Sequence, residues 1–269
     1  MAKNSVFVIL TDENYFFRAK KTISDLRSVG KWNGDVAVIC VNFNLPINFK
    51  KFYNITEVHF QEINKTLLLE QIKTKFPDGD GRELDKLNQW EKLHVFDEYF
   101  LAWEKVIFID AGLRILDSVE HLLNLECNNS FLAPNDAGFA NKPDKIFSSQ
   151  ISFGNVDLVN KLTNEFGNEI LDSHYFLNCI WIYDTKILKI IKKVELIEYM
   201  NKYPLCKTNE MTIMNLVIHF KYNLWKQFPH FVPGEKKYLF DWCELNNPTT
   251  HWTDYCYLKY PVTINFDDT

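Results

Sequence analysis

Glycine-rich phosphate-binding signatures are missing from this chain. Glycine provides only 9 of the 269 residues, and neither G-x-G-x-x-G nor G-x-x-x-x-G-K-[ST] occurs. Both signatures need glycine where the backbone lies against phosphate, so dinucleotide binding of the Rossmann type and P-loop chemistry are unsupported. The polar turn at residues 11–15 also lacks glycine. A nucleotidyltransferase would usually carry a glycine-rich loop after its first strand, so the sequence argues against that class as well.

Metal-binding cysteine pairs and hydrolase motifs are missing too. The six cysteines lie far apart with no C-x-x-C pair, and several stand in apolar runs. We therefore expect reduced core cysteines in a reducing compartment, and neither a disulfide framework nor a zinc site. The sequence contains no G-x-S-x-G motif, no H-E-x-x-H motif and no visible Cys–His pairing. A hydrolase is accordingly poorly supported.

Long apolar runs and a basic face are absent as well. No window reaches the ~18 consecutive apolar residues of a transmembrane helix, and the amino terminus lacks the apolar stretch of a signal peptide. The sequence therefore predicts a soluble, cytoplasmic protein. The net charge is −5 and the lysines are interleaved with acids, so there is no footprint for nucleic acid. A homodimer is compatible with these sequence features.

The strongest local pattern is a buried strand that ends in an aspartate. Residues 106–112 read VIFIDAG, an unbroken apolar run followed by Asp110, alanine and glycine. A short run without alternation is typical of a strand covered on both faces in a parallel sheet. An unpaired carboxylate is costly to bury, so we expect Asp110 at the edge of that sheet, where open α/β folds bind ligands. Capping of the turn after the strand is the alternative role.

Strand and helix patterns alternate through the chain. The predicted strands are residues 6–10, 36–41, 57–60, 106–109 and 179–183. The predicted helices are residues 15–29, 66–76, 84–100, 157–166, 185–200 and 210–220. The first strand, helix and strand form a βαβ unit, which indicates a parallel sheet. Residues 228–265 contain four prolines and are expected to be loop-like. With no repeat or linker in view, the sequence predicts one domain over residues 1–269.

Four segments carry a resemblance to a known family. They read ILTDENY at residues 9–15, EKLH at 91–94, VIFIDAGLRIL at 106–116 and EMTIMN at 210–215. In this order they resemble the base-binding turn, the T-K-L-H segment, the V-F-M-D-A-D-x-x-V-L strand and the D-Q-G-I-L-N helix start of nucleotide-sugar glycosyltransferases with the GT-A fold. The family 8 and glycogenin-like group is the most similar. The resemblance covers roughly residues 5–220 and fades in the tail.

The resemblance implies a definite architecture. The protein would be of the α/β class with the GT-A fold, a single Rossmann-like, mainly parallel central sheet flanked by helices, and an irregular carboxyl-terminal part. Residues 1–116 would form the nucleotide-binding half of the domain, and residues 117–269 the acceptor-side half.

The resemblance also implies a metal site, with one departure. In the family a D-x-D pair binds Mn²⁺ or Mg²⁺, which bridges the donor diphosphate. Here residues 110–112 read D-A-G, so the second aspartate is missing. The implied ligands are Asp110 and, in place of a late family histidine, His251, with His230 as the second candidate. Three options stay open: other ligands complete the site, Lys92 or Arg114 meets the phosphate charge, or Asp110 only hydrogen-bonds the ribose.

Further donor contacts follow from the same comparison. Tyr15 could stack on the base or anchor the core, and Asp12 could accept a hydrogen bond from the nucleoside or cap the helix. Lys92 could reach a phosphate or remain a solvated helix lysine. The implied nucleotide-binding residues are Thr11, Asp12, Tyr15, Lys92, Asp110, Ala111, Gly112 and Arg114.

Two residues of the second half are implied at the donor sugar. Asn178 stands, displaced by one position, where the family has F-N-S-G, and Glu210 replaces the aspartate of D-Q. The Glu210 carboxylate could orient the sugar or stabilise positive charge at its anomeric carbon, or merely favour the helix start. The implied reaction is retaining transfer of a hexose-type sugar from a UDP-sugar to a hydroxyl of a glycan, protein or small molecule. The alternative is a weak or inactive GT-A scaffold, or a nucleotide-sugar-binding protein.

Overall fold

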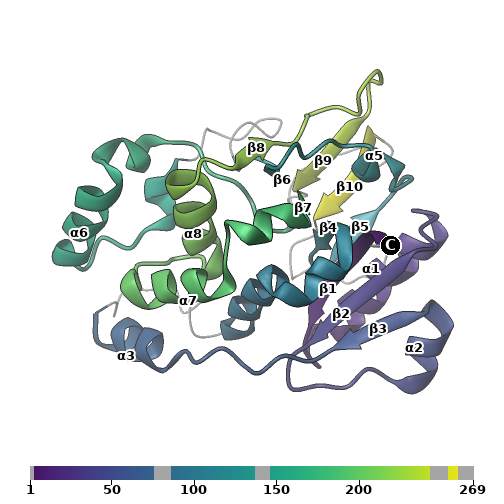
Figure 1. Ribbon diagram of the computed structural model, residues 1–269, viewed down its shortest axis with the longest axis horizontal. Helices are drawn as coiled ribbons and strands as arrows, with labels where there is room; N and C mark the ends of the chain where they lie inside the picture. Colours follow the sequence, from purple (N-terminus) through teal and green to yellow (C-terminus); the bar gives the residue numbers. More distant parts are fainter. Residues whose placement is uncertain (1–2, 76–85, 137–145, 243–253, 260–269) are drawn as a thin grey trace.

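The computed structural model describes residues 3–75, 86–136, 146–242 and 254–259 (Figure 1). A seven-stranded sheet has the strand order β3-β2-β1-β4-β7-β6-β8, and a smaller sheet has the order β5-β10-β9. The strands of the large sheet are β1 (Lys3–Thr11), β2 (Asp35–Cys40), β3 (Ile55–Val58), β4 (Trp103–Ile109), β6 (Phe131–Ala133), β7 (Ile180–Asp184) and β8 (Trp225–Gln227). The small sheet consists of β5 (Leu113–Ile115), β9 (Tyr238–Trp242) and β10 (Tyr255–Lys259).

Helices flank the large sheet. The α-helices are α1 (Phe16–Ser28), α2 (Ile47–Tyr53), α3 (Thr66–Lys75), α5 (Glu120–Leu123), α6 (Val156–Phe166), α7 (Lys193–Lys202) and α8 (Glu210–Met214). The 3₁₀ helices are η1 (Leu87–Phe96), η2 (Glu98–Ala102), η3 (Phe147–Gln150), η4 (Asn168–Asp172) and η5 (Thr185–Lys189), and a π-helix, η6 (Asn215–Lys221), continues α8. Within the described ranges, none of these helices has the length and apolar character needed to span a bilayer.

The first half of the large sheet is parallel and buried. Strand β1 pairs in parallel with β2 on one side and with β4 on the other. Residues 6–9 and 106–109 are fully buried, which confirms the two buried strands expected there. Because Val8 pairs with Phe108, the carboxyl ends of β1 and β4 reach the same edge of the sheet. Thr11 and Asp110 therefore lie at that edge.

The element that precedes β4 differs from the prediction. An α-helix was expected over residues 84–100, but the described part of this stretch forms the 3₁₀ helices η1 and η2. The apolar side chains that suggested a helix run from Leu84 to Phe100 at spacings of three and four. Within the described residues, Leu87, Trp90, Leu93 and Phe96 are each three residues apart. That spacing matches the three residues per turn of a 3₁₀ helix. Glu91 and Lys92 of η1 are buried as well.

Two predictions about the second half were wrong in detail. The helix expected at residues 185–200 is divided into η5 and α7, with residues 190–192 between them. The tail expected to be loop-like contains β9 and β10. Strand β10 is fully or almost fully buried, and it pairs antiparallel with β5. Strand β5 lies some 140 residues earlier in the chain, so no local sequence pattern could predict this pairing. The tail thereby returns to the end of β4.

Candidate functional site

Asp110 opens a tight turn between β4 and β5 at the carboxyl edge of the large sheet. Its backbone N–H donates to the Cys179 carbonyl over 2.9 Å, and the Leu113 N–H donates back to the Asp110 carbonyl over 3.0 Å. Gly112 has a φ of 96°, a left-handed conformation that glycine adopts without strain. Because a side chain would be strained there, the backbone itself disfavours a second aspartate at residue 112.

Thr22 of α1 holds this turn through both functions of its hydroxyl. The Gly112 N–H donates to Thr22 Oγ1 over 3.1 Å, and the hydroxyl donates to the Leu113 carbonyl over 2.9 Å. Thr22→Val removes both hydrogen bonds at nearly constant volume and leaves two buried backbone groups without these partners. We therefore expect the free energy of unfolding to fall by about 1–3 kcal/mol.

Chemical denaturation measures this loss, with Thr163→Val on α6 as the matched control. The partly exposed Thr163 hydroxyl bonds only carbonyls of its own helix. We expect the control to change the free energy of unfolding by less than about 0.5 kcal/mol. Equal losses in the two variants would contradict a special role for Thr22.

Lys92 of η1 lies between two carboxylates from distant parts of the chain. Its Nζ is 2.9 Å from Asp110 Oδ1, 3.0 Å from Glu210 Oε1 and 3.5 Å from the Asn178 carbonyl oxygen. An ammonium has three hydrogens, so these three acceptors use all of them. Burial opposes the charge on this ammonium, but the two carboxylates outweigh burial and raise the pKa of Lys92. Lys92 is therefore a saturated, charged centre of the cluster.

Glu210 at the start of α8 and Asn178 before β7 form the next contact of the cluster. Asn178 Nδ2 donates to Glu210 Oε1 over 2.6 Å. Glu210 is 1% exposed, and within the described ranges its Oε2 has no hydrogen-bond partner. Burial raises the pKa of Glu210 in spite of the neighbouring ammonium of Lys92. A buried oxygen without a partner is costly, so the unused hydrogen-bonding capacity of Oε2 marks Glu210 as a candidate functional residue.

A strained residue positions Glu210. Asn209 has φ 54° and ψ −131°, a conformation rarely adopted by residues with a side chain. Its Nδ2 donates to the Lys86 carbonyl over 3.4 Å and to Gln89 Oε1 over 3.3 Å. These bonds tie the start of α8 to η1 and so hold Glu210 beside Lys92. Sequence reasoning missed Asn209, and the tolerance of asparagine for positive φ was the only signal available.

Lys259 is the member of the cluster that the sequence did not reveal. Its Nζ is 2.9 Å from Asp110 Oδ2 and 3.2 Å from the Ala111 carbonyl oxygen. The antiparallel register of β10 and β5 pairs Lys259 with Leu113, three residues after Asp110. Burial opposes the charge on Asp110, but Lys259 and Lys92 together hold the pKa of this carboxyl below its usual value. Nothing in its local sequence distinguishes Lys259 from the other lysines.

The predicted residues at the end of β1 lie next to this cluster. Asp12 Oδ1 accepts from the Tyr15 N–H over 2.9 Å, which closes the turn before α1. Asp12 Oδ2 accepts from Asn88 Nδ2 of η1 over 2.7 Å. Burial raises the pKa of Tyr15, and the charges that act on this phenol include those of Asp110 and Lys92. The Tyr15 ring is therefore within electrostatic reach of the cluster.

The other predicted residues contribute less or lie elsewhere. Arg114 forms a buried ion pair with Asp25 of α1, so the structure does not bring its guanidinium to Asp110 as the prediction allowed. The Thr11 hydroxyl is buried and donates to the carbonyl of the next residue over 2.9 Å. Ala111 offers its carbonyl to Lys259. His251 lies outside the described residues.

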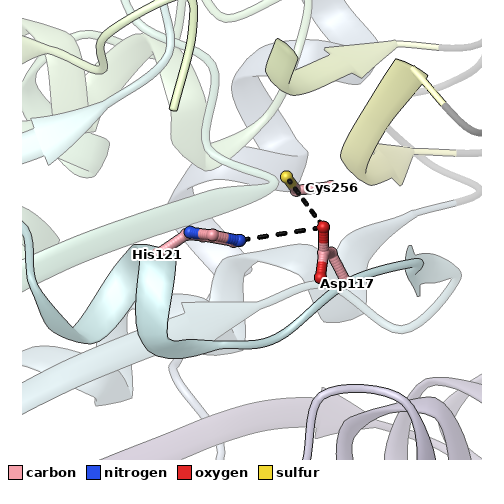
Figure 2. A group of neighbouring side chains, drawn as sticks. All are labelled: Asp117, His121 and Cys256. Atoms are coloured by element: carbon pink, nitrogen blue, oxygen red, sulfur yellow. Dashed lines mark hydrogen bonds and ion pairs between the residues drawn. The ribbon is translucent and has the colours of Figure 1, made fainter. Parts of the chain in front are cut away.

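A second group of possible metal ligands consists of Asp117, His121 and Cys256 (Figure 2). His121 Nε2 and Cys256 Sγ are 3.7 Å and 3.9 Å from Asp117 Oδ2. The same carboxylate oxygen pairs with the Lys237 ammonium. Burial raises the pKa of the Cys256 thiol to about 12. A protonated thiol and a carboxylate oxygen already paired with an ammonium are poor ligands, so we assign no metal to this group.

A shallow hollow lies at the carboxyl end of β2. It is lined by Ile39, Cys40, Val41, Asn42, Phe60, Glu62, Glu91 and His94. The Val41 N–H donates to the Thr11 carbonyl over 3.0 Å, so the hollow adjoins the turn at residues 11–15. On its wall the Phe60 ring stacks on His94 with a centroid distance of 4.6 Å. The hollow and the cluster thus flank the same turn.

Solved structures share this arrangement of strands and helices. The apo structure of WbbM, a bifunctional glycosyltransferase, aligns with a TM-score of 0.57 at 16% identity, over 96% of this chain and 46% of WbbM. The galactosyltransferase LgtC, solved with donor and acceptor sugar analogues, aligns with a TM-score of 0.56 at 12% identity, over 95% and 86%. The core-mannan synthase CmsA of Aspergillus fumigatus, in a Mn/GDP form, aligns with a TM-score of 0.54 at 10% identity, over 84% and 73%.

The chain has the GT-A fold. The predicted fold class is thereby confirmed, including the mostly parallel central sheet flanked by helices. At these identities the likeness concerns the fold alone, and this GT-A chain spans less than half the length of WbbM. No protein-family model and no curated protein sequence matches the chain, so the assignment to family 8 stays a prediction. In this GT-A protein the cluster around Lys92 lies at the sheet edge where open α/β folds bind ligands.

Proposed function

We propose that the protein is a glycosyltransferase that moves a hexose-type sugar from a UDP-linked donor to a hydroxyl acceptor. One observation carries this proposal: Lys92, Asp110, Asn178 and Glu210 meet in a single cluster. They come from three of the four segments that resemble the nucleotide-sugar glycosyltransferases and from the position resembling F-N-S-G. Buried charges are costly to desolvate, and groups with shifted pKa values cluster at functional sites, so this convergence favours a ligand site.

On this proposal the donor lies along the edge of the sheet. The base and ribose contact Tyr15 and Asp12 at the turn that follows β1. The diphosphate lies at Asp110, and the sugar faces Asn178 and Glu210. Lys92, whose three hydrogens are all used, acts as a positioning residue. Its ammonium binds the carboxylates of Asp110 and Glu210 and fixes their relative position.

The chemistry requires stabilisation of two opposite charges. Transfer breaks the bond between the anomeric carbon and the β-phosphate oxygen, forms a bond from that carbon to the acceptor oxygen, and releases the hydroxyl proton. Positive charge develops on the sugar and negative charge on the departing nucleoside diphosphate. The unpartnered Oε2 of Glu210 is suited to the positive charge. Retention of configuration belongs to the proposal through the sequence resemblance alone.

The described residues fit a divalent cation poorly. CmsA was solved with manganese and GDP, and the sequence led us to expect Mn²⁺ or Mg²⁺ at Asp110 and His251. These ions prefer about six oxygen ligands in octahedral geometry. Here both oxygens of Asp110 already bind ammonium groups, and Gly112 offers no carboxylate. We therefore derive no step through a metal.

A panel of UDP-, GDP- and CMP-sugars tests the proposed function. We expect one donor class to raise the melting temperature, since a ligand at about 100 times its Kd stabilises the folded state by about 2.7 kcal/mol. The same donor should release its free nucleotide slowly with water as acceptor, measured by chromatography. Absence of any shift and any release, in EDTA and in excess Mn²⁺ or Mg²⁺, would contradict the proposal and favour the inactive scaffold.

A further inference from the structure

We propose that the ammonium of Lys259 takes the place of a divalent cation at this site, so that the protein binds a nucleoside diphosphate without metal. The inference rests on the proposed function and deepens it. It starts from the carboxylate of Asp110, whose Oδ1 binds Lys92 and whose Oδ2 binds Lys259, each at 2.9 Å. A metal ion bound to this carboxylate would lie close to both ammonium groups and would be repelled by their positive charges.

The two lysines differ in what remains available to a ligand. Lys92 has three acceptors for its three hydrogens, so it can offer none to a phosphate. Lys259 has two acceptors, Asp110 Oδ2 and the Ala111 carbonyl. For its third hydrogen the described residues provide no acceptor. Lys259 is therefore the cation of this pair that can donate to an oxygen of the diphosphate.

The backbone directs Lys259 to this position. Strand β10 lies between β5 and β9, and its residues 256–258 are fully buried. The register of β10 with β5 sets Lys259 opposite Leu113, and its side chain is 11% exposed. Such a side chain has little rotational freedom left to lose when it binds an anion. The ammonium is thus held at the turn before any ligand arrives.

The charge balance of the site also supports the replacement of a divalent cation by Lys259. Two aspartates and a divalent cation sum to zero, and so do one aspartate and one ammonium. At residue 112 the glycine removes one negative charge, and Lys259 supplies one positive charge instead of two. Residues 110, 112 and 259 therefore present the same net charge to a diphosphate as a metal-loaded pair of carboxylates would, while Lys92 and Glu210 add one charge of each sign.

Calorimetric titration with UDP, GDP, UMP and GMP, in EDTA and in excess MnCl₂, tests the inference. We expect the wild-type protein to bind one nucleoside diphosphate with a Kd that differs by less than about threefold between the two conditions. Lys259→Met should weaken diphosphate binding by about 10- to 100-fold, the size of a lost charge-assisted hydrogen bond. The Kd of the matching monophosphate should stay unchanged, and Lys259→Arg should retain most of the diphosphate affinity.

Lys237→Met is the matched control. Lys237 precedes β9 in the same small sheet and pairs with Asp117, away from Asp110, so nucleotide affinities should not change. Wild-type binding that is lost in EDTA and restored by Mn²⁺ overturns the inference but leaves the proposed function standing. An unchanged diphosphate Kd in Lys259→Met, or an equal loss for mono- and diphosphate, overturns it as well. If no nucleotide binds in either condition, the proposed function fails and the inference fails with it.

Discussion

Lys92→Met is expected to lower the free energy of unfolding by about 3–5 kcal/mol, because removal of one partner leaves buried charge uncompensated. The ammonium is 2.9 Å from Asp110 and 3.0 Å from Glu210, and its side chain is only 4% exposed. Methionine has a similar length but carries no charge, so the carboxylate of Glu210 would lose its neutralising partner. Because Glu210 is the first residue of α8, we expect the start of this helix to loosen. A loss of this size lowers the melting temperature by roughly 10 °C in a chain of this length.

The double variant Lys92→Met with Glu210→Gln separates charge from packing. Since it removes one positive and one negative charge together, we expect it to recover part of the lost stability. Lys192→Met serves as the surface control, because its ion pair with Glu98 spans 3.5 Å between exposed side chains. Exposed pairs contribute about 0–1 kcal/mol, so this control should melt close to wild type. A Lys92→Met protein that melts with wild type would show that the buried cluster is not charged as described.

Glu210→Gln is expected to lower the rate of donor turnover by about 10²- to 10³-fold while leaving the Kd of the nucleoside diphosphate nearly unchanged. Glutamine keeps the size of the side chain and can still accept from Asn178, so the fold around α8 should persist. What is lost is the negative charge on the buried oxygen that has no partner among the described residues. A group that acts on the sugar cation affects turnover more than binding of the departing nucleotide.

Glu120→Gln is the matched control for Glu210→Gln. Both glutamates lie in the first turn of an α-helix, but Glu120 of α5 is exposed. If Glu210 acted only by favouring its helix start, the two variants would behave alike. Release of nucleotide from the best donor of the panel measures turnover, and calorimetry measures the Kd. Full turnover in Glu210→Gln, or an equal loss of turnover and nucleotide affinity, would remove the assigned role.

Sequence patterns served well where structure depends on neighbouring residues. The buried strands at residues 6–9 and 106–109 follow from unbroken apolar runs, and α6 follows from its helical spacing and the glycine at its end. The pattern misled where two helix types share a spacing, since residues three apart suit both the expected α-helix and the observed 3₁₀ helix η1.

The candidate site was only partly accessible from the sequence. Asp110, Lys92 and Glu210 stood in segments that resemble a known family, and the structure brings them within ion-pair distance. Asn209 could not be foreseen, because its role depends on a backbone conformation that no local pattern specifies. Arg114 was a reasonable candidate by position, but its side chain turns to Asp25 of α1. The direction of a side chain is set by packing, which the sequence does not state.

The sequence by itself determined that a buried parallel strand ends in a single carboxylate, because hydrophobic runs and the residues that end them act locally. It also determined that a glycine occupies residue 112, where the family pattern has a second aspartate. Only the tertiary structure revealed that the ammonium of Lys259 binds this carboxylate beside that of Lys92. Strand β10 pairs with β5 across some 140 residues of chain, and this pairing alone carries Lys259 to Asp110.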